Sequence, residues 1–191
     1  DVCSYPVSDL KEKALRYRRI GLGAMGFADL LVQLRVPYNS RGGLKKAAAL
    51  IKFIRKETDA ASMALAKEKG AFPGIKESIY GKRGKKYRNL TRLSIAPTGS
   101  LSMLADCSPS IEPLFALSYV KRVMGGKEFF YIDKNFERAI DELGLHKEEI
   151  IEKVVHHASV RDIDEIPLAL RRVFVVAQEI APEWHIKMQA A

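Results

Sequence analysis

The sequence is poor in cysteine and has no long apolar run. Two cysteines, Cys3 and Cys107, occur among its 191 residues. They are too few for a disulfide framework, so a reducing, cytoplasmic setting is expected. No stretch of 18 residues is both apolar and uncharged, which predicts that nothing spans a membrane. With 8 prolines, 13 glycines and 47% hydrophobic residues, the composition excludes a disordered or collagen-like chain and favours a globular core.

Acidic residues are scarce in the first half of the chain. Residues 1–92 contain 21 Lys and Arg against 8 Asp and Glu, a net charge of +13, whereas residues 93–191 contain 11 against 15, a net charge of −4. A basic half is one signature of a nucleic-acid-binding module. The basic run over 82–92 contains one aromatic residue, Tyr87. Proteins that bind single-stranded nucleic acid use several aromatic rings on which the bases stack. We therefore favour a solvated face, or a surface neutralised by a missing partner, and keep nucleic-acid binding as an alternative.

Hydrophobic periodicity predicts a mostly helical chain with a few strands. Helices are expected over about 9–19, 27–34, 40–69, 134–143, 147–157, 167–177 and from 182 onward, with a helical turn over 101–105. Strands are expected over 90–96 and 115–123, and a loop over 74–89.

Local patterns make these predictions specific. Asp9 and Glu12 have the spacing of a capping box at the first helix. Asn39 or Ser40 is expected to cap the long helix, which Gly70 ends. Three- and four-residue spacing predicts one buried stripe on that helix, made of Leu44, Ala47, Ile51, Ile54, Ala61 and Leu65. Alternation over 90–96 places one set on one face (Thr91, Leu93, Ile95) and another on the opposite face (Arg92, Ser94).

Residues 21–26 read Gly-Leu-Gly-Ala-Met-Gly and match the G-x-G-x-x-G fingerprint of NAD-binding dehydrogenases. That motif needs a buried strand before it and an acidic residue about 20 positions further on. Here residues 10–19 are charged and helix-prone, and no acidic residue lies between Ala47 and Lys56. A glycine-lined helix face against which another backbone packs is therefore favoured, and a dehydrogenase stays an alternative.

Residues 96–102, Ala-Pro-Thr-Gly-Ser-Leu-Ser, lie between a predicted strand and a helical turn. A turn that opens a helix presents backbone N–H groups and the positive end of the helix dipole to an anion. Thr98, Ser100 and Ser102 add hydroxyl donors, and Gly99 allows the backbone to approach a ligand closely. The residues are thus consistent with a phosphate site, and a plain turn capped by Thr or Ser is an equally favoured alternative.

The other potential ligands and nucleophiles form no recognisable cluster. The four histidines are His146, His156, His157 and His185. Two of them are adjacent and so point to different sides of a helix, and the other two are isolated, which favours surface or capping roles over metal binding. Nothing places a base beside Cys3 or Cys107, so ordinary thiols are favoured over a nucleophile or a radical-bearing thiol.

The order of several segments is more informative than any one motif. The segments are Arg-Arg-Ile-Gly-Leu-Gly-Ala-Met-Gly-Phe-Ala-Asp-Leu-Leu (18–31), Val-Pro-Tyr-Asn-Ser (36–40), Gly-Ala-Phe-Pro (70–73), Arg-Asn (88–89), Ile-Ala-Pro-Thr-Gly-Ser-Leu-Ser (95–102), Ile-Glu-Pro-Leu-Phe-Ala-Leu (111–117) and Trp-His-Ile-Lys-Met-Gln-Ala-Ala (184–191). Together they closely resemble the catalytic chain of ribonucleotide reductase, over nearly all of the sequence. The closing run looks most like the adenosylcobalamin-dependent class.

The resemblance implies a fold class and a domain assignment. The fold is a mostly helical α/β fragment with a few strands, part of a ten-stranded α/β barrel, in which residues 1–191 form a partial catalytic domain. The chain opens without Met and closes on an uncapped helix, so we expect both ends to be interior to a longer protein. The glycine segment at 21–26 resembles a barrel-packing helix of the family.

The resemblance also implies a radical enzyme that reduces ribonucleotides to 2′-deoxyribonucleotides, with adenosylcobalamin as cofactor and a thioredoxin-type protein as reductant. The family's thiyl cysteine, its assisting Glu and Asn and its redox cysteine pair belong to segments before Asp1, so no catalytic residue is assigned here. The stretch that resembles the substrate-phosphate loop is Pro97, Thr98, Gly99, Ser100 and Leu101. Whether the substrate is a diphosphate or a triphosphate stays open.

One loop departs from the family pattern. The family usually has Gly before Ile-Glu-Pro, where this chain has Pro109 and Ser110. Proline fixes φ and serine resists a positive φ, so the conformation of this loop beside the substrate stays open. The basic loop over 82–86 has no counterpart that the resemblance assigns.

Overall fold

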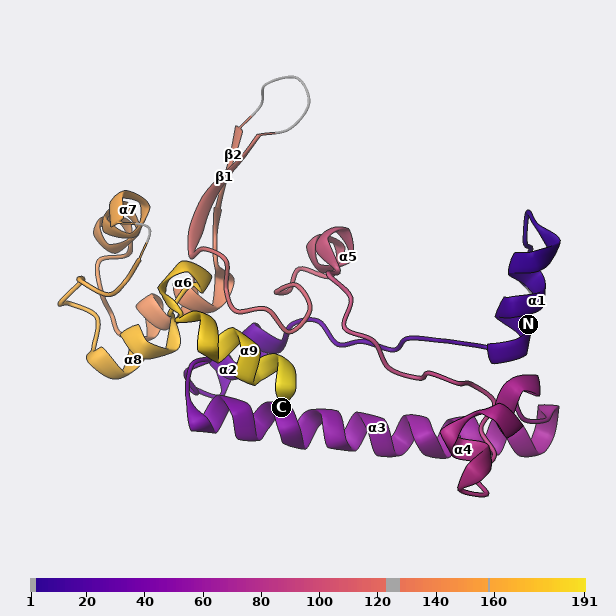
Figure 1. Cartoon of the computed structure of the whole chain (residues 1–191). Coiled ribbons are helices and arrows are strands. Elements are labelled where there is room, and N and C mark those ends of the chain that lie inside the picture. The colour runs from indigo at the N-terminus through magenta and orange to yellow at the C-terminus, as the bar shows by residue number, and fades with distance from the viewer. Residues whose placement is uncertain (1–2, 123–127, 158) are drawn as a thin grey trace. The chain divides into compact units, whose positions relative to one another are not determined.

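The computed structural model describes residues 3–122, 128–157 and 159–191 of the chain. These residues form two compact units. Unit 1 comprises Asp1–Gly23 and Ala49–Ala96, and unit 2 comprises Ala24–Ala48 and Pro97–Ala191. Figure 1 shows the order of the elements along the chain. In the described part of the chain no helix is long and apolar enough to cross a membrane.

The described residues are mostly helical. The elements are α1 (Ser8–Tyr17), α2 (Phe27–Gln33), α3 (Arg41–Lys69), η1 (Pro73–Glu77), α4 (Ile79–Lys82), α5 (Gly99–Leu104), β1 (Ser118–Arg122), β2 (Glu128–Ile132), α6 (Lys134–Glu142), α7 (Lys147–His157), α8 (Leu168–Val173), η2 (Ala177–Glu179) and α9 (Pro182–Ala190). Most predicted helices are confirmed. The loop predicted over 74–89 is wrong in part, because η1 and α4 occupy much of it.

Helix α1 begins one residue before the predicted start and lacks the predicted capping box. Its N-cap is Val7, and no side chain caps the first turn. The helix ends where Arg18 adopts a left-handed conformation and donates its N–H to the carbonyl of Ala14. Backbone geometry at the C-terminus, rather than a side-chain cap at the N-terminus, therefore fixes the end of this helix.

The long helix α3 has the predicted ends but not the predicted buried stripe. The Ser40 hydroxyl accepts the Gly43 N–H at 3.0 Å, and Gly70 follows the helix with a φ of +81°. The Arg88 guanidinium donates to the carbonyl oxygens of Lys69 and Gly70. The six stripe residues are half-buried or exposed, whereas three small residues, Gly43, Ser62 and Ala66, are buried. Small side chains let neighbouring segments approach this helix closely.

The strand predicted over 90–96 is wrong as a regular strand. The segment forms one isolated parallel bridge, between Leu22 and Leu93, with hydrogen bonds on either side of it. The predicted alternation also fails, because Arg92 is 7% exposed while Ile95 is 50% exposed. Arg92 can be buried because its guanidinium is hydrogen-bonded and ion-paired to groups of unit 1. Hydrophobic periodicity does not show such pairing.

Unit 2 has the larger apolar core. Residues from α2, α6, α7 and α8 and from the segments that join them are buried together, and Phe136 packs edge-on against Phe174 with ring centroids 5.2 Å apart. Asp133 caps α6, because its carboxylate accepts the N–H groups of Asn135 and Phe136. Helix α8 stops at Val173 rather than running on to residue 177, and the buried Val176 precedes the separate turn η2.

A two-stranded antiparallel hairpin lies within unit 2. Strands β1 and β2 pair from Ser118↔Ile132 to Arg122↔Glu128, and Figure 1 shows them side by side. Strand β1 starts three residues after the predicted start at 115, and Val123, the predicted end, lies outside the described residues. The sequence reading missed β2. The stacked rings of Tyr119 and Tyr131, 5.3 Å apart, are a cross-strand pair that stabilises the hairpin.

Candidate functional site

The segment 97–101 forms an exposed turn that opens α5 (Figure 1). Thr98 is the N-cap and adopts a left-handed conformation, with φ 54° and ψ 26°. Its carbonyl accepts the N–H of Ser102 at 2.8 Å. Gly99 and Ser100 are exposed, and Leu101 is 59% exposed. The turn therefore faces solvent rather than a packed neighbour within unit 2.

The first backbone amides of α5 are not used by the fold. Among the described residues, the N–H groups of Gly99, Ser100 and Leu101 have no hydrogen-bond acceptor, as expected for the first turn of a helix without a side-chain cap. A Cβ built on Gly99 would meet no heavy atom within 4 Å. Three N–H donors, two hydroxyls and an unobstructed backbone can together bind an anion.

The loop that follows α5 returns to Thr98. The N–H of Ser110 donates to Thr98 Oγ1 at 2.7 Å. Ser110 has a φ of 49°, so it adopts the left-handed conformation that its residue type was expected to resist. Ser110 is 2% exposed. The structure thus settles the conformation that the sequence left open: Ser110 takes a left-handed φ, which glycine would adopt more easily.

A buried carboxylate anchors the same loop to α2. Asp29 Oδ2 accepts the N–H of Ser108 at 2.6 Å, and the Asp29 N–H donates to the Ser108 hydroxyl. Asp29 Oδ1 accepts from the side-chain amide of Asn135 on α6 at 3.1 Å. The N–H of Gly26 also donates to the Ser108 carbonyl. Sequence reasoning missed Asp29 and Asn135, although a lone aspartate in the apolar run Phe-Ala-Asp-Leu-Leu-Val was a usable signal.

The glycine-rich segment 21–26 is not a helix face, and that prediction is wrong. Residues 21–25 are not helical and form one bridge, at Leu22, and α2 begins only at Phe27. The predicted close approach of another backbone is confirmed at Gly23, where a Cβ would lie 2.8 Å from the Ser94 carbonyl oxygen. A Cβ on Gly21 would lie 2.3 Å from the Ser94 side-chain oxygen. Helix α1, not a strand, precedes the segment. The strand–turn–helix context that a dinucleotide site requires is therefore absent from these residues.

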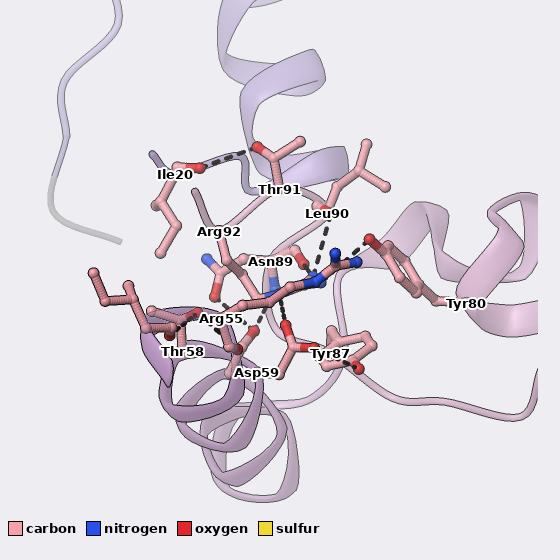
Figure 2. Close-up of polar contacts among 12 residues, drawn as sticks. Ile20, Arg55, Thr58, Asp59, Tyr80, Tyr87, Asn89, Leu90, Thr91 and Arg92 are labelled. Atoms are coloured by element: carbon pink, nitrogen blue, oxygen red, sulfur yellow. Dashed lines mark hydrogen bonds and ion pairs between the residues drawn. The ribbon is translucent and has the colours of Figure 1, made fainter. Parts of the chain in front are cut away.

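Unit 1 contains a second polar cluster, centred on Arg92 (Figure 2). Arg92 Nε donates to Asp59 Oδ1 at 2.5 Å, and its other nitrogens donate to the carbonyls of Asn89 and Leu90 and to the Tyr80 hydroxyl. The guanidinium also lies over the Tyr87 ring, 4.2 Å from its centroid. Burial alone would lower the pKa of Arg92, but the hydrogen bonds to Tyr80 and Asp59 raise it above its ordinary value. The cation is held charged by partners within the unit.

Asn89 ties this cluster to α3 and to the end of α1. Its side-chain oxygen accepts from the Ser62 hydroxyl at 3.0 Å, its N–H donates to the same hydroxyl, and its side-chain amide donates to the Arg18 carbonyl. Every one of these bonds joins two groups of the protein. The Arg92 cluster is therefore a structural network within unit 1.

The basic run over 82–92 divides into two parts. Lys82, Arg83, Lys85 and Lys86 are exposed, as the solvated-face interpretation predicts. Arg88 and Arg92 instead turn toward carbonyl oxygens and Asp59. A run whose last two cations have protein partners is a poor platform for nucleic acid.

The cysteines are free thiols, and His185 makes a ring contact within unit 2. Cys3 is exposed and Cys107 half-buried, and both are free thiols. Within the described ranges, no three His, Cys, Asp or Glu side chains come close enough together to hold a metal ion. The ring of His185 lies 6.3 Å from that of Tyr38, a packing contact between α9 and the segment before α3.

Comparison with known proteins identifies the family. The family model described as "Ribonucleotide reductase, barrel domain" matches residues 1–87 and 81–191. A vitamin B12-dependent ribonucleoside-diphosphate reductase of Thermoplasma acidophilum is 42% identical over 190 residues, which is all of this chain and 25% of that protein. The enzyme of the same name from Mycobacterium tuberculosis is 37% identical over 191 residues and 27% of its own length.

A solved structure agrees with the sequence relatives. The class Id ribonucleotide reductase alpha subunit of Actinobacillus ureae superposes with a TM-score of 0.80 and 28% identity, covering 98% of this chain and 34% of that one. The chain thus spans about a quarter of the curated relatives and a third of the solved structure. No comparison supports a dehydrogenase or a nucleic-acid-binding module. The chain belongs to the ribonucleotide reductase family and is part of its barrel domain.

Proposed function

We propose that these residues are the barrel segment of an enzyme that reduces ribonucleotides to 2′-deoxyribonucleotides. The proposal rests on the family and on the relatives, which are named as ribonucleoside-diphosphate reductases. Those relatives are about four times as long as this chain. The remainder of the catalytic chain would supply the thiyl and redox cysteines, and this segment would help to bind the substrate.

Within that enzyme, residues Pro97–Leu101 bind the phosphates of the ribonucleotide. The single observation that carries this assignment is that the N–H groups of Gly99, Ser100 and Leu101 have no acceptor among the described residues and lie in an exposed turn. Amides at a helix start stabilise negative charge, and the hydroxyls of Thr98 and Ser100 lie in the same turn. Gly99 supports the assignment because nothing obstructs the approach of a phosphate to its backbone.

The cofactor assignment rests on the relatives alone. Both curated relatives are named as vitamin B12-dependent, so we propose adenosylcobalamin, which would supply the radical when bound. The described residues offer no cluster of metal-ligating side chains, so no residue of this chain is assigned to the corrin or its cobalt. A thioredoxin-type reductant and a cytoplasmic setting complete the proposal, and two free cysteines are compatible with a reducing compartment.

The decisive experiment uses the intact enzyme under anaerobic conditions with adenosylcobalamin and a dithiol reductant. Cytidine diphosphate and cytidine triphosphate are supplied separately, and the deoxynucleotide formed is quantified by chromatography. We expect one of the two to be reduced, and the other to react at least tenfold more slowly. Absence of any deoxynucleotide with both substrates, from an enzyme shown to bind cobalamin, would contradict the proposed activity.

A further inference from the structure

A cavity within unit 1 is lined by four segments of the chain. Its volume is about 730 Å³, which is in the range of pockets that bury a ligand. The lining comes from the segment before α1, from α1 and the residues that follow it, from the end of α3 and from residues 88–89. All of these residues belong to unit 1, so this unit forms the cavity by itself.

Helix α1 presents a stripe of side chains to this cavity and buries none of them. Leu10, Lys13, Ala14 and Tyr17 line the cavity, and their spacing of three and four residues places them on one face of the helix. No residue of α1 is buried, and Leu10 is 54% exposed. A helix of ten residues is marginal in water without a packed apolar face. The stripe therefore lacks the cover that would stabilise this helix.

The cavity is also basic. Lys13 lies in the stripe, and Arg19 lines the cavity just after the end of the helix. Arg16, elsewhere on α1, is ion-paired with Glu77 at 2.6 Å, whereas no carboxylate of the described residues pairs with Lys13 or Arg19. In the described part of the chain no Asp or Glu lines the cavity. Two cations beside an apolar wall are thus available to an acidic partner.

The other cations of the lining add positive charge although they are not free. Arg18 and Arg88 have partners of their own, and Lys69 lies 3.9 Å from the carboxylate of Glu68. Burial lowers the pKa of Arg88, and the positive charge of Arg18 lowers it further. Residues 1–92 as a whole carry a net charge of +13. A group that binds in this cavity is therefore expected to be negatively charged.

We propose that an acidic segment of the same polypeptide, outside residues 1–191, occupies this cavity in the intact enzyme. A carboxylate of that segment pairs with Lys13 and Arg19, and an apolar side chain beside it covers Leu10 and Ala14. An occupant from the same polypeptide is favoured because the relative from Thermoplasma acidophilum is about four times as long as this chain, and a tethered segment has a high effective concentration. The inference rests on the proposed longer enzyme and is independent of the phosphate-binding role of residues 97–101.

The first test identifies the occupant by photo-cross-linking in the intact enzyme. p-Benzoylphenylalanine replaces Leu10 on α1 or, in a second variant, Leu65 on α3, and cross-linked peptides are identified by mass spectrometry. We expect both probes to capture one segment from outside residues 1–191, with Asp or Glu within a few positions of the cross-link. A probe at Lys11, on α1 but outside the lining, is the control and should not capture it. Cross-links confined to residues 1–191, or to a segment without an acidic residue, would overturn the inference.

The second test asks whether charge holds the segment in place. We expect Lys13→Glu to lower the yield of that cross-link at least about tenfold, because like charges repel strongly in a docked interface. Lys11→Glu should leave the yield within twofold. Replacing the captured acidic residue by lysine in the Lys13→Glu enzyme should restore the yield, which also shows that Lys13→Glu folds. Equal losses in Lys13→Glu and Lys11→Glu, or no recovery after the charge exchange, would contradict the proposed pairing.

Two further outcomes would assign the cavity to a different occupant and overturn the inference. Cross-links between isotope-labelled and unlabelled copies would place a second copy there. A melting temperature that pyrophosphate raises in the wild type but not in Lys13→Glu would place a small anion there. Deoxynucleotide formation is measured on the same wild-type preparation: a missing cross-link with normal activity removes only this inference, whereas an inactive enzyme with the expected cross-link contradicts only the proposed reaction.

Discussion

The two polar clusters of this chain contain similar groups and put them to different uses. In unit 1 the Arg92 cluster pairs a buried cation with Asp59, two backbone carbonyls and a tyrosine hydroxyl. In unit 2 the turn at 97–101 offers N–H groups that no described residue accepts. The donors of the first cluster have acceptors within the protein, and those of the second have none among the described residues. Open donors on an exposed turn can bond water or, as proposed above, a phosphate, whereas satisfied donors in a buried network contribute to stability.

The largest expected effect is the loss of the closed cluster. Replacing Arg92 by leucine leaves Asp59 partly buried without its cation, which we expect to lower the free energy of unfolding by about 3 kcal/mol. Arg83→Leu removes an exposed cation of the same unit and should change the free energy of unfolding by less than about 0.5 kcal/mol. Urea titration followed by circular dichroism measures both. A loss of less than 1 kcal/mol for Arg92→Leu, on the order of a surface change, would show that the cluster is not structural.

The next effect belongs to the open turn. Gly99→Val places a branched side chain where the phosphate would approach, so we expect at least about tenfold weaker nucleotide binding, or ~1.4 kcal/mol. Because a Cβ at Gly99 meets no atom within 4 Å, the melting temperature should change little. Leu104→Val, at an 85% exposed position of the same helix, is the control and should bind normally. Isothermal titration with cytidine diphosphate measures the affinity, and equal affinities for the two variants would count against the site.

A smaller effect separates backbone strain from binding in unit 2. Ser110→Gly keeps the N–H that Thr98 accepts while removing both the left-handed strain and the unpartnered buried hydroxyl. Relief of that strain, offset by the greater freedom of glycine when unfolded, predicts a stability gain of up to about 1 kcal/mol. Calorimetry measures the gain, and nucleotide affinity should stay within twofold. A clear loss of stability would mean that the serine side chain packs usefully.

The smallest effect concerns a carboxylate that, unlike Asp59, has no cation bonded to it. Burial raises the pKa of Asp133 above its ordinary value of 3.8, against the lowering effect of the N–H groups of Phe136 and Asn135. The folded state therefore binds this proton more tightly than the unfolded state does. The charged carboxylate lowers the stability of the protein at pH values above its folded-state pKa, and this loss disappears as the pH falls through the ordinary value of 3.8. Asp133→Asn keeps the N-cap. Its free energy of unfolding should exceed that of the wild type by less than about 1 kcal/mol between pH 4 and 7.

Urea titrations of Asp133→Asn at pH 4 and pH 7 provide the comparison. The difference from the wild type should widen as the pH rises, and Asp162→Asn, at an exposed position, is the control for the loss of a surface carboxylate. A difference that narrows with rising pH would mean that the helix dipole, rather than burial, dominates at this cap.

Helices with strong local signals could be predicted from the sequence. Asp133 caps α6, Gly70 ends α3 and Pro182 begins α9, because caps, glycine and proline act within a few residues of themselves. The exposed turn before α5 was predictable for the same reason. The buried stripe on α3 was not, because apolar spacing says which face is apolar but not whether anything packs on it.

By itself, the sequence determined most of the helices, the glycine-bearing turn at 97–101 and, through the order of its segments, the family. Only the tertiary structure decided that Arg92 is buried, that Asp29 anchors the loop after α5 and that Ser110 takes a left-handed conformation. The reason is physical. Caps and turns are fixed by neighbours along the chain, whereas a buried charge or a strained φ is stable only when a partner distant in sequence, here Asp59 for Arg92 and Thr98 for Ser110, is brought within hydrogen-bond distance.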